Sequence, residues 1–98
     1  MTTKLNMFNN QIYWSSPCAS LDRPVIGIIC GSNYTFMFDA CSSTNHANEI
    51  SKCINDLNIR KPEFICISHS HSDHWFGLHK FTAPSVCSKK CMNNIIPW

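Results

Sequence analysis

The sequence predicts one small α/β domain, in which a sheet is combined with a single long helix. Two β-branched and aromatic runs, at 25–30 and 34–38, flank a short turn and read as a β-hairpin. Apolar residues at helical spacing follow over 47–57. A third apolar run, at 63–68, comes after this helix. The order strand, helix, strand favours a right-handed crossover that returns the chain to the same sheet.

The N-terminal elements can be placed from turn and strand residues. Residues 11–14 read as a first strand, and Asp-Arg-Pro at 22–24 reads as a turn before the hairpin. Gly-Ser-Asn at 31–33 supplies the hairpin turn. The second hairpin strand then ends at Asp39. A polar loop at 41–45 offers several N-cap residues for the helix.

The helix is predicted from apolar residues that fall on one face: Ala47, Ile50, Cys53, Ile54 and Leu57. Asn58 and Pro62 mark its end. The strand at 63–68 has a continuous apolar centre, which is expected when both faces of a strand are covered. Further on, we expect a short helix at 75–80, a short strand at 84–87, and a last helix from Lys89 capped by Ser88.

Composition excludes several classes of protein. The chain has 98 residues and a net charge of +2, which is too small to indicate nucleic-acid binding. No stretch approaches the roughly 18 apolar residues of a membrane span, and the first ten residues lack a secretory signal. Seven cysteines, an odd number, several of them in apolar runs, read as reduced thiols. A cytoplasmic location is therefore expected.

A cluster of metal-ligand residues follows the strand at 63–68. His69, His71, Asp73 and His74 form the pattern H-x-H-x-D-H. Imidazole and carboxylate bind the same cations, and ligand sites of open α/β sheets lie beyond the carboxyl ends of strands. The cluster predicts a metal site, and the alternative is a polar surface loop that happens to be rich in histidine.

The spacing divides the cluster into two pairs. His69 and His71 are two residues apart, so in an extended segment they point to the same side and can reach one ion. Asp73 and His74 turn away and can address a second ion, and two neighbouring ions can bind a bridging hydroxide. A site with open coordination positions would be catalytic, whereas a closed four-ligand site would be structural. The motif alone allows both.

This motif, set between an apolar strand and Gly77, resembles the signature of the metallo-β-lactamase-fold hydrolases. The segment Phe36-Met-Phe-Asp39-Ala-Cys41 resembles the strand of that family that ends in an Asp-Thr-Gly or Asp-Ala-Gly turn. The resemblance runs best over 22–86. It implies that the domain, 1–98, is the N-terminal half of a four-layer αββα fold, with hairpin strands, one helix and a strand that ends in the histidine motif.

The same resemblance implies roles for single residues. His69 and His71 would bind a first metal ion and Asp73 and His74 a second, with Asp73 the candidate catalytic residue. Asp39 would brace the ligand loop, although alone it also reads as a turn or cap carboxylate. The ions would be zinc, with iron or manganese as alternatives. A metal-bound hydroxide would attack the carbonyl or phosphoryl centre of a small-molecule substrate.

The chain departs from this family in two ways. Cys41 stands where the family usually has Gly, which is costly if the position requires φ > 0. The family fold is also roughly twice as long, so further ligands and most of the substrate pocket would lie in a second half. We therefore expect self-association or a complementing C-terminal half as partner. A non-catalytic metal-binding module, or an inactive truncated product, is the alternative function.

Other residues do not fill the missing ligand positions. His46 and His79 read as a core or surface histidine, and Cys87 and Cys91, four residues apart, lack the second pair of a zinc finger. Large apolar side chains have little to be buried against in a half-fold: Trp14, Phe36, Phe38, Phe76 and Trp98. We expect a marginally stable chain that associates or aggregates.

Overall fold

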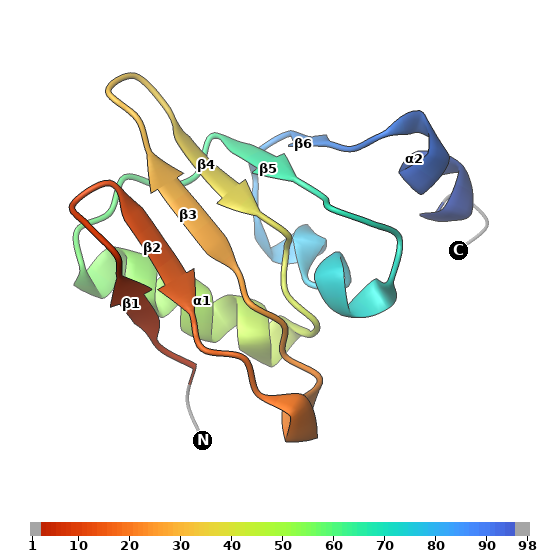
Figure 1. Ribbon diagram of the computed structural model, residues 1–98, viewed down its shortest axis with the longest axis horizontal. Coiled ribbons are helices and arrows are strands. Elements are labelled where there is room, and N and C mark those ends of the chain that lie inside the picture. Colours follow the sequence, from red (N-terminus) through yellow and green to blue (C-terminus); the bar gives the residue numbers. More distant parts are fainter. Residues whose placement is uncertain (1–2, 96–98) are drawn as a thin grey trace.

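The computed structural model describes residues 3–95 and shows a single sheet with one long helix against it (Figure 1). The strands are β1 Leu5–Met7, β2 Ile12–Ser15, β3 Gly27–Cys30, β4 Thr35–Phe38, β5 Phe64–Cys66 and β6 Ser85–Val86. The α-helices are α1 Thr44–Asp56 and α2 Lys89–Ile95, and the 3₁₀ turns are η1 Ala19–Leu21, η2 Ser72–His74 and η3 Leu78–Lys80. Trp98 lies outside the described residues.

The six strands lie in the sheet in chain order. β1 to β4 are antiparallel neighbours, whereas β4, β5 and β6 run parallel. A parallel pair needs a crossover, and α1 is the crossover between β4 and β5, as the sequence order predicted. Thus the α/β class and the hairpin–helix–strand order are confirmed. β1, which pairs with β2, the first predicted strand, was not anticipated.

One face of the sheet packs on α1. Ile28, Met37 and Ile65 are cross-strand neighbours on this face, and none is exposed to solvent. They form the core together with Ala47 and Ile50 of α1, which are also fully buried. The hydrophobic positions of α1 thus lie where a helical period places them.

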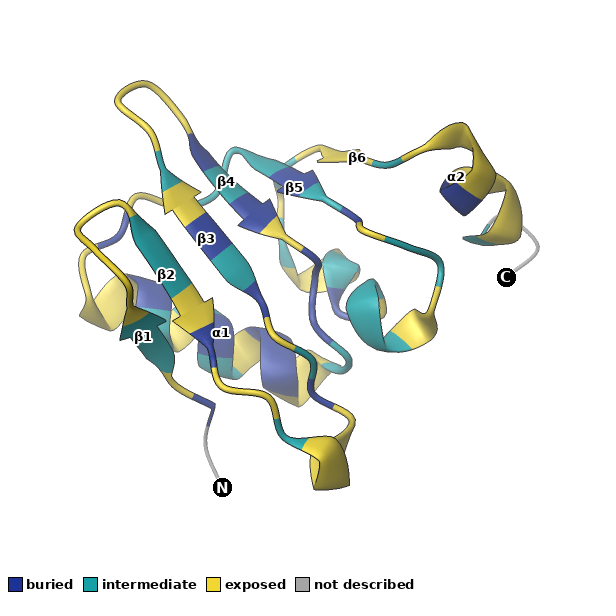
Figure 2. Cartoon of the chain, in the orientation of Figure 1, coloured by how far each residue is buried: buried dark blue, intermediate teal, exposed yellow. Residues whose placement is uncertain are grey.

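The opposite face of the sheet is largely apolar and lacks charge. The strand registers place two cross-strand rows on it, and all ten of its residues are uncharged: Asn6, Trp14, Gly27, Phe38, Cys66 and Val86 in one row, and Ile12, Ile29, Phe36 and Phe64 in the other. Trp14 is 41% exposed, Phe38 40% and Val86 52%. Among the described residues no helix lies over β2 to β5 on this side (Figures 1 and 2). We call it the open face.

Three local expectations are wrong. The apolar centre of β5 indicated coverage on both faces, but only Ile65 is buried; Phe64 and Cys66 lie half-buried on the open face. Leu57 is 48% exposed, because the helix ends before it and it serves as the C-cap. Residues 75–80 hold a 3₁₀ turn, η3, in place of a short α-helix.

The start of α1 contains a buried histidine. Ser43 is the N-cap, and its side chain accepts from the His46 amide at 3.1 Å. His46 is fully buried, and its Nδ1 accepts from the Ser42 amide at 3.1 Å. Burial, with the neighbouring Arg23 charge, lowers the pKa of His46 to about 4, against the opposing effect of Glu49. The imidazole is therefore neutral in the folded protein at pH 7.

A close contact joins the turn after β4 to the segment after η2. Ala40 donates to the His74 carbonyl at 2.7 Å, and Gly77 donates to the Cys41 carbonyl at 3.0 Å. A Cβ on Gly77 would lie 2.5 Å from the Ala40 carbonyl oxygen, so this approach requires glycine. Cys41 has φ of 75° and is fully buried, which confirms that the position takes a left-handed conformation.

His46 makes stability depend on pH in a defined window. Between pH 6.5 and about 4, His46 binds a proton in the unfolded chain but not in the folded chain. The free energy of unfolding therefore falls as the pH falls through this window, and His46 causes no loss of stability above pH 6.5. We expect a loss on the order of 2 kcal/mol. His46→Asn keeps an acceptor for the Ser42 amide but does not titrate. Denaturant unfolding at pH 7 and pH 4.5 should therefore show a smaller loss in the variant. Equal losses would contradict this assignment.

Candidate metal centre

The four motif residues lie in the loop that leaves β5. The loop begins after Ile67, whose amide bonds the Val86 carbonyl at 2.9 Å and so extends the β5–β6 pairing by one step. His71 precedes η2, and Asp73 and His74 lie in η2 itself. The motif thus lies at the carboxyl end of the parallel strands, where such sheets bind ligands.

Asp39, at the end of β4, holds this loop by three hydrogen bonds. Its carboxylate accepts from the Ser68 amide at 2.7 Å, from the Ser68 hydroxyl at 2.8 Å, and from His74 Nδ1 at 2.7 Å. Asp39 is 6% exposed, so the carboxylate exchanges water for these three donors. The residue therefore connects β4 to both ends of the histidine loop.

These bonds fix which ring nitrogen of two histidines carries the proton. A carboxylate only accepts, so His74 donates from Nδ1 and keeps a lone pair on Nε2. The Ser68 hydroxyl has given its hydrogen to Asp39, so at 2.8 Å it accepts from His69 Nδ1. His69 likewise keeps its lone pair on Nε2. The lone pair is what a metal ion needs from imidazole.

Asp73 and His74 bring two possible donor atoms close together. Asp73 Oδ1 lies 3.7 Å from His74 Nε2. Two ligands of a tetrahedral zinc ion, each at about 2.0–2.1 Å, are separated by about 3.4 Å. The pair thus has nearly the separation that a shared ion requires. The Asp73 side chain is 39% exposed and open to solvent.

The three imidazole rings gather around His69. Its ring centroid lies 4.7 Å from that of His71 and 4.0 Å from that of His74. His71 is exposed, whereas His69 and His74 are half-buried. The donor types therefore suit zinc, and the loop brings all three rings together.

Within residues 3–95, no three His, Cys, Asp or Glu side chains are arranged so that they could hold one ion together. His46 is buried at the start of α1, and His79 is exposed, with its Nε2 3.1 Å from the Thr44 hydroxyl. Cys87 and Cys91 lie near the start of α2, where Cys91 is buried. The motif residues thus fit a metal by donor type and tautomer, as part of a ligand set.

Two residues that support the loop were not anticipated. Ser68 relays the Asp39 carboxylate to His69, and the Trp75 indole donates to the Ser70 carbonyl at 2.8 Å, which closes the loop across five residues. A serine directly before the motif is a weak signal for such a relay. The pairing of Trp75 with a backbone carbonyl has no sequence signal.

Comparison with known proteins agrees with this architecture. The family model described as the metallo-beta-lactamase superfamily matches residues 21–97. No curated protein sequence matches the chain.

Several solved structures share the fold. A metallo-beta-lactamase from Hirschia baltica is 14% identical, with a TM-score of 0.79, and the match covers 99% of this chain and 48% of that one. The FIM-1 metallo-beta-lactamase of Pseudomonas aeruginosa, in its mono-zinc form, is 7% identical, with a TM-score of 0.73 and coverages of 99% and 46%. A double mutant of the sec-alkyl sulfatase PisA1 is 17% identical, with a TM-score of 0.78 and coverages of 97% and 16%.

At these identities the solved structures show the fold, and the chain spans less than half the length of each of them. Nearly all of the chain is matched, so the hairpin, the helix and the parallel strands form one continuous part of the larger fold. The family model covers most of the sequence, including the whole histidine loop. The predicted resemblance is confirmed, and the chain belongs to the metallo-beta-lactamase superfamily.

Proposed function

We propose that the chain carries part of the metal centre of a zinc-dependent hydrolase. The observation that carries the proposal is the Asp39 network, which directs the lone pairs of His69 and His74 to Nε2. When bound, zinc supplies a Lewis acid for a carbonyl or phosphoryl oxygen and lowers the pKa of water. The substrate would be a small molecule, and iron or manganese are alternatives to zinc.

Each residue of the loop has a separate task in this proposal. His69 and His71 would hold a first ion, and Asp73 and His74 a second, for which their 3.7 Å separation is suited. Asp39 keeps both tautomers in place without touching an ion. Asp73, whose side chain is 39% exposed, is accessible to a substrate and to water.

The remaining ligands would come from outside the described residues. No described His, Cys, Asp or Glu completes a three-donor set, and the superfamily structures are more than twice as long as this chain. We infer that a complementing segment covers the open face and completes both the ligand set and the substrate pocket. We also place the protein in the cytoplasm, because all seven cysteines are free thiols and suit a reducing compartment. No helix among the described residues is long and apolar enough to cross a membrane.

A non-catalytic metal-binding module, or an inactive truncated product, is the second candidate. The incomplete donor set favours it. An ion held by the loop alone would keep several water ligands and would have no substrate pocket around it. Assays of ester, thioester, lactam and phosphodiester hydrolysis, with and without added zinc, separate the two candidates: zinc-dependent turnover supports the hydrolase, and bound zinc without turnover supports the module.

Zinc binding should depend on the motif. His69→Ala combined with His71→Ala removes two imidazole donors, so we expect zinc per chain after dialysis to fall well below that of the unmodified protein. His79→Ala is the matched control, since His79 is exposed and bonded to Thr44 and the Phe76 carbonyl, away from the ligand set. Elemental analysis of the purified proteins gives the stoichiometry. Unchanged zinc in the double variant would overturn the metal assignment.

The serine relay should tune zinc affinity. Ser68→Ala removes the hydroxyl between Asp39 and His69 but keeps the backbone bond from residue 68 to Asp39. Loss of such a supporting group typically weakens metal binding 10- to 100-fold, so we expect about tenfold. Competition with a coloured chelator measures the affinity. Ser70→Ala, in the same loop, should bind zinc like the unmodified chain; equal affinity in both variants would refute the relay.

The isolated chain should self-associate through the open face. The open face has no charged residue, so two copies can pack these faces together without burying a charge. Exposed apolar side chains such as Trp14 and Phe38 favour this association. Phe38→Lys places an ammonium on the face, so sedimentation should show less association. Leu57→Lys makes the same kind of change at an exposed apolar residue away from this face, the C-cap of α1, and should leave association unchanged. A chain that sediments as a monomer at all concentrations would contradict this prediction.

A further inference from the structure

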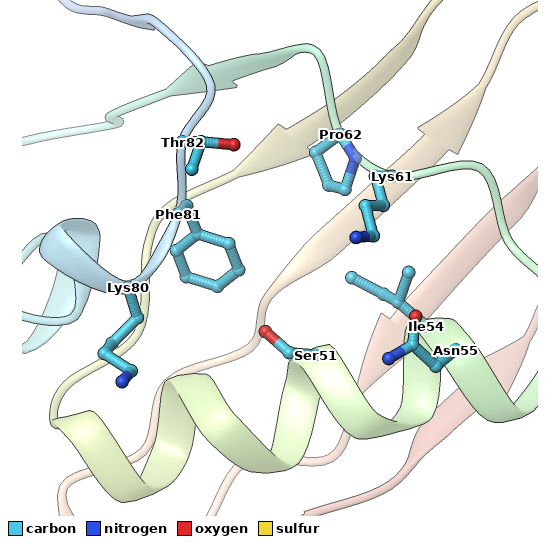
Figure 3. A pocket seen from close by; sticks show the side chains of 8 residues that line it. All are labelled: Ser51, Ile54, Asn55, Lys61, Pro62, Lys80, Phe81 and Thr82. Atoms are coloured by element: carbon cyan, nitrogen blue, oxygen red, sulfur yellow. The ribbon is translucent and has the colours of Figure 1, made fainter.

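A cavity lies at the opposite end of β5 from the histidine loop. It has a volume of about 200 Å³ and is lined by three segments: α1 with Ser51, Ile54 and Asn55, the connection before β5 with Lys61 and Pro62, and the segment after η3 with Lys80, Phe81 and Thr82. Figure 3 shows the Phe81 ring in the middle of the opening, with Ser51 and Lys61 facing it from two sides. Neither the metal centre nor the open face includes these residues.

The interior of this cavity is apolar. Ile54 is 3% exposed, and Pro62 and Phe81 are half-buried. Phe81 also packs against the core from the side of the cavity. A flat aromatic surface, a proline ring and an isoleucine together favour a ligand with an apolar, planar body.

The rim of the cavity is positively charged. Lys61 and Lys80 have no ion-pair partner among the described residues, whereas four neighbouring charges are paired: Lys52 bonds Asp56 at 3.1 Å, and Arg60 bonds Glu63 at 3.0 Å. The two acidic groups nearest in sequence are thus already neutralised. Ser51, Asn55 and Thr82 add hydroxyl and amide groups around the opening. The rim therefore favours an anion over a cation.

We propose that this cavity binds a small aryl carboxylate, with the ring against Phe81 and the carboxylate at the rim beside Lys61, while Lys80 adds positive charge from the other side of the Phe81 ring. The volume of about 200 Å³ suits a ligand with a single ring. The two lysines and the three polar side chains at the rim suit a ligand with one anionic group. A single-ring ligand has about nine heavy atoms. At about 0.5 kcal/mol of binding free energy for each atom, its Kd is about 1 mM. Binding at this site does not require a metal ion, because none of the lining residues is a candidate metal ligand.

Benzoate is the probe. We expect ¹H–¹⁵N spectra of the chain, recorded in EDTA, to show saturable shifts at Ser51, Asn55, Lys61 and Thr82. Benzyl alcohol and acetate, which each lack one half of the recognition, should bind more weakly. Added salt should weaken the binding of benzoate and leave the binding of benzyl alcohol unchanged, since salt screens the charge of the anion and benzyl alcohol has no charge.

Charge-removing variants test the lysines. In the double variant Lys61→Gln, Lys80→Gln we expect benzoate to bind about fivefold more weakly, which is the effect of an exposed ion pair of about 1 kcal/mol. The double variant Lys89→Gln, Lys90→Gln removes the same charge on α2 and should bind as the unmodified chain does. Both lysine pairs are exposed, so both variants should fold. Shifts that do not saturate, or equal affinity in the two double variants, would overturn the proposal.

Discussion

The Asp39 carboxylate is the constraint on which the histidine loop depends. It lies at the end of β4, is 6% exposed, and accepts from residues 29 and 35 positions further along the chain. A buried carboxylate without these donors would be costly, so the loop and the strand end stabilise each other. The same bonds set the tautomers of His69 and His74. One residue thus joins the end of β4 to the positions and tautomers of the candidate ligands.

The backbone around Asp39 shows what this arrangement costs. Asp39 has φ of 67° and Cys41 φ of 75°, and left-handed conformations of residues other than glycine cost about 1 kcal/mol each. The cost at Cys41 is offset by its complete burial, which also raises the pKa of its thiol to about 12, with a smaller contribution from the Asp39 charge. Cys41 therefore acts as a small apolar residue of the core. Gly77 makes the turn possible by letting its backbone approach Ala40.

The sheet has one packed face and one open face, and the candidate ligands of the histidine loop do not form a three-donor set among the described residues. The chain matches less than half the length of the superfamily structures. The core between α1 and the sheet is complete, because Ile28, Met37, Ala47 and Ile50 are fully buried. The cavity beside Phe81 belongs to this completed side. Its groups therefore do not depend on whatever covers Trp14 and Phe38.

Local patterns in the sequence determined the elements and the motif. The period of Ala47, Ile50 and Ile54 gave α1, the turn at 31–33 gave the hairpin, and the H-x-H-x-D-H spacing gave the candidate ligands, because these features depend on neighbours within a few residues. The tertiary structure decided the exposure of Leu57, the half-burial of Phe64 and the left-handed conformation of Cys41. It also decided which nitrogen of His69 and of His74 carries the proton. Each of these depends on contacts between segments distant in sequence, such as Asp39 with His74, or on a face that nothing in the described chain covers. No periodicity in a single sequence contains that information.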